Sequence, residues 1–234
     1  MALTKTILNG HTVEYDNTEF EILTSYCSKE KYLHYIGNGG NVHNPKGNTS
    51  CYRMFDSFNG TSLDLSNFDT HNITNMSFMF FYCQNLKSLN LSNFNTKNVV
   101  DMSGMFSYCE SLKKVDLSNF ITQNVNDMSY MFNKCYNLIT LNLSNFHTYS
   151  VNSMKSMFSN CVNLKKLDIS NFDLTKEERI NSMFTFCKKL EKIIIDSNLF
   201  QYISDNKNSF LRDCENVSII STTQINKTIK DLFY

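Results

Sequence analysis

Residues 89–114 read LNLSNFNTKNVVDMSGMFSYCESLKK, and copies of this 26-residue unit follow one another along most of the chain. The cysteine, the Met-Phe pair and the Ser-Asn-Phe triplet of the unit recur in step. A fixed period of this length is the signature of a repeat architecture, in which each unit buries its apolar side against its neighbours. Degenerate copies extend the array to about residues 51–220. The cysteines that mark the full copies are Cys83, Cys109, Cys135, Cys161 and Cys187.

Each unit combines two hydrophobic periods. The apolar residues of the MxxMFxxC segment, Met76 to Cys83 in the first full copy, fall at i, i+3, i+4 and i+7, which predicts a short helix. Leu89-Asn90-Leu91 alternates apolar and polar residues as a strand does. We therefore predict an α/β repeat fold. It would be a right-handed, leucine-rich-repeat-like solenoid of about six to seven coils, with one short parallel strand and one short helix per coil.

These motifs resemble a known family of repeats. The pattern LxxLxL, followed by a polar residue and phenylalanine, is similar to a leucine-rich repeat. The full unit, with its LSNF or ISNF step and its MFxxC step, resembles the BspA-like repeats of bacterial and mycoplasmal surface proteins. The resemblance covers about residues 51–200 and weakens at Leu174–Ile180, where LTKEERI replaces the repeated pattern. It implies adhesion or another protein–protein contact rather than catalysis.

The two ends of the array are expected to be capped, because terminal coils expose apolar faces. Residues 1–50 carry no repeat, and Val13–Tyr15 and Phe20–Leu23 read as strands, which predicts a β-rich N-terminal capping region. Residues 221–234 have the apolar spacing of a C-terminal capping helix.

Composition and charge exclude several classes of function. The chain has 22 Lys and Arg against 22 Asp and Glu, so its formal net charge is zero and we expect no nucleic-acid partner. No apolar run is long enough for membrane insertion as a helix. The first 25 residues do not have the pattern of a secretory signal peptide, so we expect a cytoplasmic protein if Met1 is native, with the cell surface as the alternative.

Residues at repeated positions are expected to form ladders through the stack. The cysteines of the ladder share one direction, so we predict buried thiols rather than disulfides or zinc ligands. Cys27 and Cys51 lie outside the ladder, and their state, free or bridged, stays open. The asparagine of each Ser-Asn-Phe triplet is predicted to satisfy backbone donors at the turns of its own and the next coil, and the phenylalanine is predicted to form a core spine.

The predicted strands carry an acidic row beside a partly basic row, which we interpret as cross-strand pairing and solubility. The first row is Asp64, Asn90, Asp116, Asn142 and Asp168, and the second is Ser62, Ser88, Lys114, Thr140, Lys166 and Lys192.

Binding is expected at positions that vary between coils, since the repeated residues build the core. Several aromatic residues stand on the predicted helical side where other coils have small or polar residues, and aromatic residues are enriched in protein interfaces. We predict that this edge, above all in the first three full units, contacts a protein partner. The candidates are Phe78, Phe81, Tyr82, Tyr108, Tyr130, Tyr136, Tyr149 and Phe186.

The function that these patterns favour is a non-enzymatic protein-binding solenoid, acting as a phage- or mobile-element-encoded inhibitor or effector on a host protein. The alternative is a cell-surface adhesin of a low-GC bacterium or mycoplasma. An exposed solenoid end would also allow a homodimer. Ice binding through the threonine row is a remote alternative, because Ser150 and Leu174 interrupt the row. An enzyme is also remote, because no catalytic motif is found, and we expect neither a metal nor a cofactor. The threonine row is Thr70, Thr96, Thr122 and Thr148.

Overall fold

Two antiparallel hairpins stand at the start of the chain. Strand β1 (Thr4–Leu8) pairs with β2 (His11–Tyr15), and β3 (Glu21–Ser25) pairs with β4 (Tyr32–Ile36). The strands predicted near Val13 and Ile22 are confirmed as parts of β2 and β3. The computed structural model describes residues 4–8, 11–15, 21–25, 32–36, 48–175, 180–205, 207–215 and 217–223.

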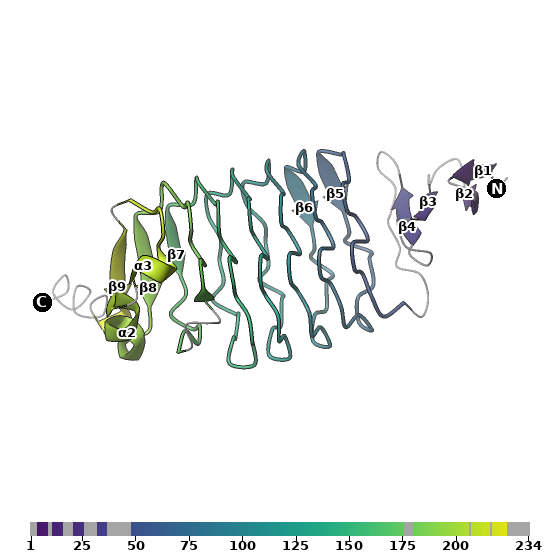
Figure 1. The fold of residues 1–234 in the computed structure, drawn as a ribbon. Helices are drawn as coiled ribbons and strands as arrows, with labels where there is room; N and C mark the ends of the chain where they lie inside the picture. Colours follow the sequence, from purple (N-terminus) through teal and green to yellow (C-terminus); the bar gives the residue numbers. More distant parts are fainter. Residues whose placement is uncertain are drawn as a thin grey trace, which may run out of the picture.

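From residue 48 onward the chain runs in successive coils that lie side by side (Figure 1). Strand β5 (Ser62–Asp64) pairs in parallel with β6 (Ser88–Asn90), so that each residue lies beside its equivalent in the next copy. Strands β7 (Lys166–Asp168), β8 (Lys192–Ile195) and β9 (Ser218–Ser221) form a second parallel sheet.

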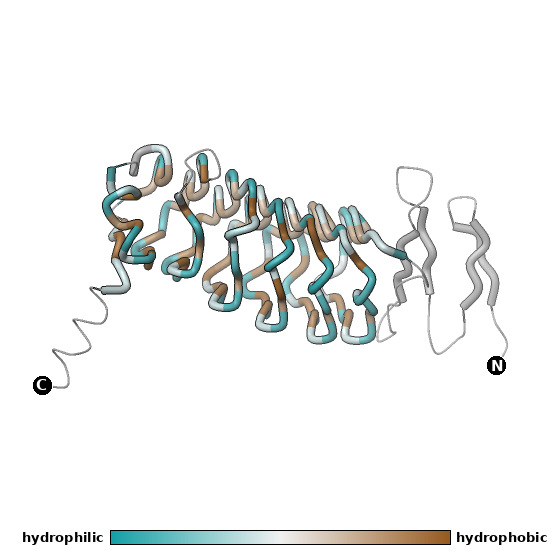
Figure 2. The backbone as a smooth tube through the Cα atoms, turned by 90° about the horizontal axis from the view of Figure 1, so that it is seen from below, coloured by the Kyte–Doolittle hydropathy of each residue, from teal (hydrophilic) through white to brown (hydrophobic). Residues whose placement is uncertain are grey.

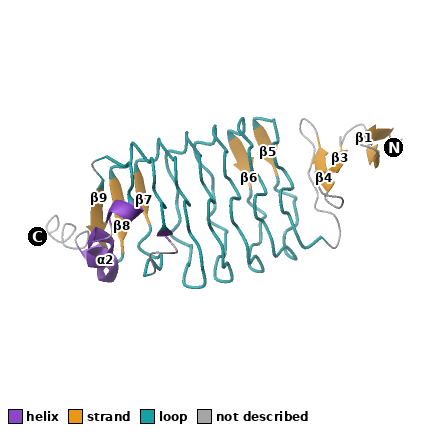
Figure 3. Cartoon of the chain, in the orientation of Figure 1, coloured by secondary structure: helices purple, strands orange, loops and turns teal. Residues whose placement is uncertain are grey.

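All helices whose bounds the structure gives lie between β8 and β9. They are the 3-10 helix η1 (Ser197–Leu199) and the short helices α2 (Phe200–Asp205) and α3 (Lys207–Phe210), purple in Figure 3. Ser221, where the C-terminal capping helix was predicted to begin, ends strand β9 instead. Most of that predicted helix, and also Cys27, lies outside the described residues.

The prediction of a short helix in each coil is wrong for the full copies up to Cys161. The segment from Met76 to Cys83 is a run of tight turns (Figure 3). The Phe80 N–H donates to Met105 of the next coil at 2.9 Å, whereas the Cys83 N–H donates back to Phe80 at 3.3 Å. Tight turns use alternate backbone N–H groups for hydrogen bonds within the coil and leave the other N–H groups to bond the next coil. They point the same apolar side chains inward as a helix would.

Apolar residues recur at the same places in each coil, as the hydropathy colours of Figure 2 show. Two stacks of phenylalanine rings run through the core. Rings from Phe55 to Phe184 lie 5.2–5.6 Å apart and nearly parallel, whereas rings from Phe68 to Phe146 lie 6.0–6.5 Å apart. The second stack is the predicted core spine, which is therefore confirmed. The rings of this stack, which are spaced more widely, lie on the side of the strands.

The cysteine ladder consists of buried thiols, as predicted. Each Sγ–H donates to a phenylalanine carbonyl of the preceding coil: Cys109 to Phe80 at 3.2 Å and Cys135 to Phe106 at 3.1 Å. Burial raises the pKa of the Cys135 thiol well above its ordinary value. Cys51 is also buried and forms no disulfide with any described residue.

The asparagine ladder differs from the prediction in the coil that it contacts and in the backbone groups with which it pairs. Asn119 Nδ2 donates to the carbonyls of Leu91 at 2.9 Å and Phe94 at 2.8 Å, and Asn145 repeats this one coil later. The asparagines therefore satisfy carbonyls of the preceding coil, not donors of their own and the next coil. The reason is that carbonyls at the corner point along the stack, where only the amide NH₂ can pair with them.

The threonine row is buried, which removes the basis for ice binding through it. Thr96 Oγ1 donates to the Ile121 carbonyl at 2.9 Å and accepts from the Ile121 N–H at 2.7 Å. Thr122 does the same with His147 in the next coil. These hydroxyls hold the coils together and are not available to a surface ligand.

The Asp and Asn row at the strand ends makes turns rather than cross-strand pairs. The Asp116 Oδ1 accepts from the Ser118 N–H at 3.0 Å, and this bond lowers the pKa of the Asp116 carboxyl. Asn142 accepts from the Ser144 N–H at 3.1 Å in the same way. Asp and Asn alternate in this row because either side chain can accept this bond.

Candidate functional site

Aromatic side chains of three successive coils form one continuous cluster at the turn segments. Phe78 lies between Tyr52 and Phe81, with ring centroids 6.2 and 5.5 Å away. Tyr108 contacts Phe81 at 5.4 Å and Tyr82 at 5.3 Å. We call these five residues the aromatic cluster.

Two cations flank the aromatic cluster. The Arg53 guanidinium lies 5.0 Å from the centre of the Phe81 ring and 5.7 Å from that of Phe78. At the other end, Lys134 Nζ donates to the Tyr108 hydroxyl at 2.7 Å and lies 4.3 Å from the ring centre. This hydrogen bond raises the pKa of Lys134, so its ammonium stays charged. Cations at these distances are attracted by the ring faces and help to order them.

The backbone explains why these side chains point away from the core. Phe78, Tyr82 and Tyr108 have φ angles of 54°, 61° and 62°, in the left-handed region. Left-handed residues in the tight turns alternate with residues whose side chains point inward, such as Met79 and Phe80. The turns therefore direct the variable residues outward and the repeated residues into the core.

Gly104 leaves the space in which the Phe78 ring lies. A Cβ atom at residue 104 would stand 2.3 Å from Phe78 Cε1, so Gly104→Ala is expected to displace that ring. We expect a loss of about 1 kcal/mol in unfolding free energy and a changed near-ultraviolet circular dichroism signal from the aromatic cluster. Ser156→Ala is the matched control, because Ser156 stands at the same repeat position with a φ of 53°. An unchanged aromatic signal in Gly104→Ala would contradict this packing.

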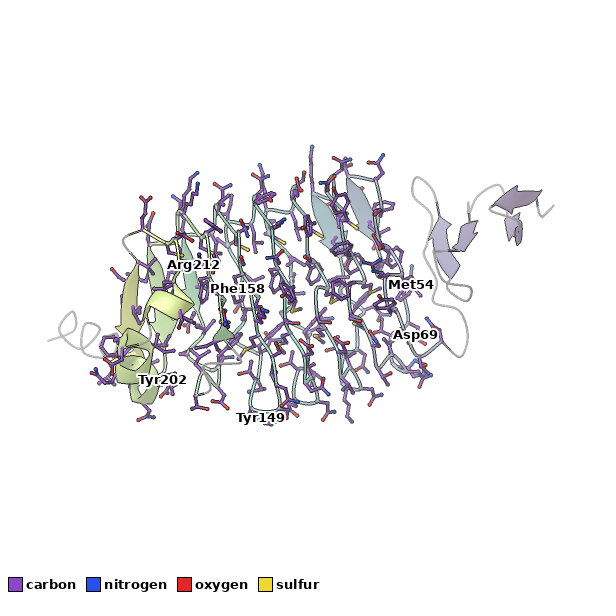
Figure 4. All side chains as sticks on the ribbon, viewed as in Figure 1. Met54, Asp69, Tyr149, Phe158, Tyr202 and Arg212 are labelled. Atoms are coloured by element: carbon purple, nitrogen blue, oxygen red, sulfur yellow. The ribbon has the colours of Figure 1, made fainter. Side chains whose placement is uncertain are left out.

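The structure brings together four of the eight predicted residues and leaves four apart. Phe78, Phe81, Tyr82 and Tyr108 belong to the aromatic cluster, and Tyr82 is 43% exposed. Tyr149 is 61% exposed but lies at another edge of the coils, near His147 (Figure 4). The other three, Tyr130, Tyr136 and Phe186, make no ring contact with the cluster.

Sequence reasoning missed Tyr52, Arg53 and Lys134. The first two precede Met54-Phe55 in a degenerate copy, where the repeat pattern is too weak to align them with later copies. Lys134 occupies the repeat position of Tyr82 and Tyr108, which is a signal that could have placed it beside them. A ladder position that changes from tyrosine to lysine brings a cation next to a ring in the adjacent coil.

The arrangement offers an apolar and cationic contact surface. In the described part of the chain, no three His, Cys, Asp or Glu side chains converge as a metal site would require. Within the same residues, no helix has the length and apolar character to span a membrane.

Comparison with known proteins identifies the family of the chain. No curated protein and no solved structure matches it. A family model described as "Mycoplasma protein of unknown function, DUF285" matches residues 49–140 and 116–223, which together span most of the array. The chain therefore belongs to the DUF285 family of mycoplasma repeat proteins.

Proposed function

We propose that this chain is a non-enzymatic, protein-binding solenoid of the BspA-like, leucine-rich-repeat type, and that the aromatic cluster is its contact surface. The observation that carries the proposal is the continuity of the cluster: five rings from three coils touch one another at a partly exposed edge. Other coils have residues such as Gly104, Lys134 and Asn160 at the positions of these rings, so the core does not require aromatic side chains there.

The chemistry of the cluster favours a protein partner. Tyrosine and arginine contribute most of the binding energy in many interfaces, because they combine apolar area with hydrogen-bonding groups. Lys134 adds positive charge beside the apolar surface, whereas Arg53, which also contacts the rings, is ion-paired with the buried Asp56 at 3.4 Å. A partner with a carboxylate near an apolar side chain would complement both features.

The double variant Tyr82→Ala/Tyr108→Ala tests the proposal. It removes two adjoining rings, and we expect at least a tenfold loss of partner retention, about 1.4 kcal/mol, as for interface hot spots. The measurement is quantitative mass spectrometry of the proteins that the immobilised full chain retains from a bacterial lysate, with the affinity of the recovered partner then measured by titration.

Tyr149→Ala is the matched control, because it removes an exposed tyrosine outside the cluster. It should retain the same proteins as the unsubstituted chain, and both variants should keep its far-ultraviolet circular dichroism spectrum. Equal retention by Tyr82→Ala/Tyr108→Ala would refute the cluster as the contact surface. An inhibitor or effector and an adhesin would both use such a contact, and fractionation of the native cells separates them by location.

A further inference from the structure

A second surface lies on the strand side, where a shallow groove of about 490 Å³ crosses three coils. It is distinct from the aromatic cluster, with which it shares no residue. Its lining consists of Lys87, Ser88, Leu89, Lys114, Val115, Asp116, Thr140, Leu141 and Asn142.

The groove coincides with an interruption of the parallel sheet. A strand was predicted in every coil, but residues 114–116 and 140–142 form none, and they lie between β6 and β7. Among the described residues, no backbone hydrogen bond joins these two segments to each other. The wide ring spacing of 6.5 Å between Phe120 and Phe146 lies in the same two coils. The parallel pairing of strand segments is therefore interrupted here.

Apolar side chains that are buried in other coils are partly exposed beside this interruption. Leu89, Val115 and Leu141 are half-buried, whereas Leu63 and Leu167 at the same repeat position are buried. Beside them, Ile139 is 42% exposed, and its N–H donates to the Lys113 carbonyl at 3.0 Å. The floor of the groove is therefore apolar and runs across three coils, in keeping with an extended chain rather than a helix.

Two lysines, Lys87 and Lys114, line the groove where its segments begin, and three more lie outside the lining at adjacent or equivalent repeat positions. They are exposed, and none forms an ion pair with any described residue. Asp116 lies at the opposite end of its strand segment, where its carboxylate accepts the Ser118 N–H. The lysines of this row are Lys87, Lys113, Lys114, Lys165 and Lys166.

We propose that this groove binds an extended acidic peptide segment that carries aliphatic side chains. Its carboxylates would pair with the lysine row, and its aliphatic groups would cover Leu89, Val115 and Leu141. A polyphosphate chain fits less well, because Asp116 lies about 7 Å along the strand from Lys114 and the apolar floor gives phosphates nothing to contact.

A random decapeptide display library, selected on the immobilised full chain, tests this proposal. We expect the enriched peptides to combine Asp or Glu with Leu, Ile or Val. The variant Lys113→Glu/Lys114→Glu should lower their binding at least tenfold, and higher salt should weaken binding to the unsubstituted chain because exposed charges are screened. The control is Lys97→Glu/Lys155→Glu, which makes the same change of charge at two exposed lysines outside both the lining and the lysine row.

Enrichment of peptides without acidic residues, or no enrichment at all, would overturn the proposal. So would acidic peptides that bind Lys113→Glu/Lys114→Glu as tightly as the unsubstituted chain. A labelled ten-nucleotide dT oligonucleotide provides the competing arm, and tighter binding of this probe than of the best peptide would assign the lysine row to nucleic acid instead. Peptides that depend on Tyr82 and Tyr108, but not on Lys113 and Lys114, would support the aromatic cluster alone.

Discussion

Phe120→Ala is expected to lower the free energy of unfolding by about 3–5 kcal/mol. The Phe120 ring is 1% exposed and stacks between Phe94 at 6.3 Å and Phe146 at 6.5 Å. Its loss leaves a cavity shared by three coils, and the neighbouring rings cannot close it without breaking the coil-to-coil hydrogen bonds. Urea denaturation followed by circular dichroism measures the change.

Phe186→Ala is the matched control for this substitution. The Phe186 ring is 42% exposed, so its removal is expected to cost about 1 kcal/mol or less. Equal losses in the two variants would mean that the stacked rings do not carry the stability of the array.

Iodoacetamide should alkylate Cys214 at least about a hundred times faster than Cys109, Cys135 or Cys161 in the folded protein. The three ladder thiols are buried, and burial raises their pKa, so they react only when their coils open. Cys214 is half-buried, and its hydrogen bond with the Cys187 thiol lowers its pKa. Peptide mass spectrometry after timed alkylation gives the rate at each site.

The pH dependence of this reaction has a definite sign. The thiolate is the nucleophile, and a lowered pKa gives Cys214 a larger thiolate fraction at neutral pH than an ordinary thiol has. Its alkylation rate should therefore rise with pH and level off at a lower pH than that of a free cysteine in a short reference peptide. A ladder thiol that reacts as fast as Cys214 at neutral pH would contradict the packing of the core.

The repeat period determined most of what could be predicted about the coils. The positions of Met79, Phe80 and Cys83 indicated which side chains face the core, and they are buried. The same spacing is compatible with a helix and with a chain of tight turns. Only the competition between bonds within a coil and bonds to the next coil distinguishes the two, and periodicity carries no information about that competition.

The candidate site was predicted in part, for a related reason. Unrepeated aromatic residues identified Tyr82 and Tyr108 as surface residues, but their contacts depend on which residues share a ladder position. Tyr149 is also an aromatic residue that the repeat does not require, but it lies elsewhere, because it follows the buried Thr148 at a different corner of the coil. The interrupted sheet had no sequence signal at all, since Val115 and Leu141 are good strand residues.

The hydrogen bonds that join neighbouring coils do not determine how many coils the array has. Cys135 Sγ to the Phe106 carbonyl, Asn145 Nδ2 to Leu117 and Thr122 Oγ1 to His147 each join two neighbouring coils. If one whole 26-residue copy were removed, every such bond would find an equivalent partner in the coil that took its place. Removal of a single residue within a coil would instead put the later bonding groups out of register with their partners. Gene duplication could therefore lengthen or shorten the surface offered to a partner without any redesign of the core.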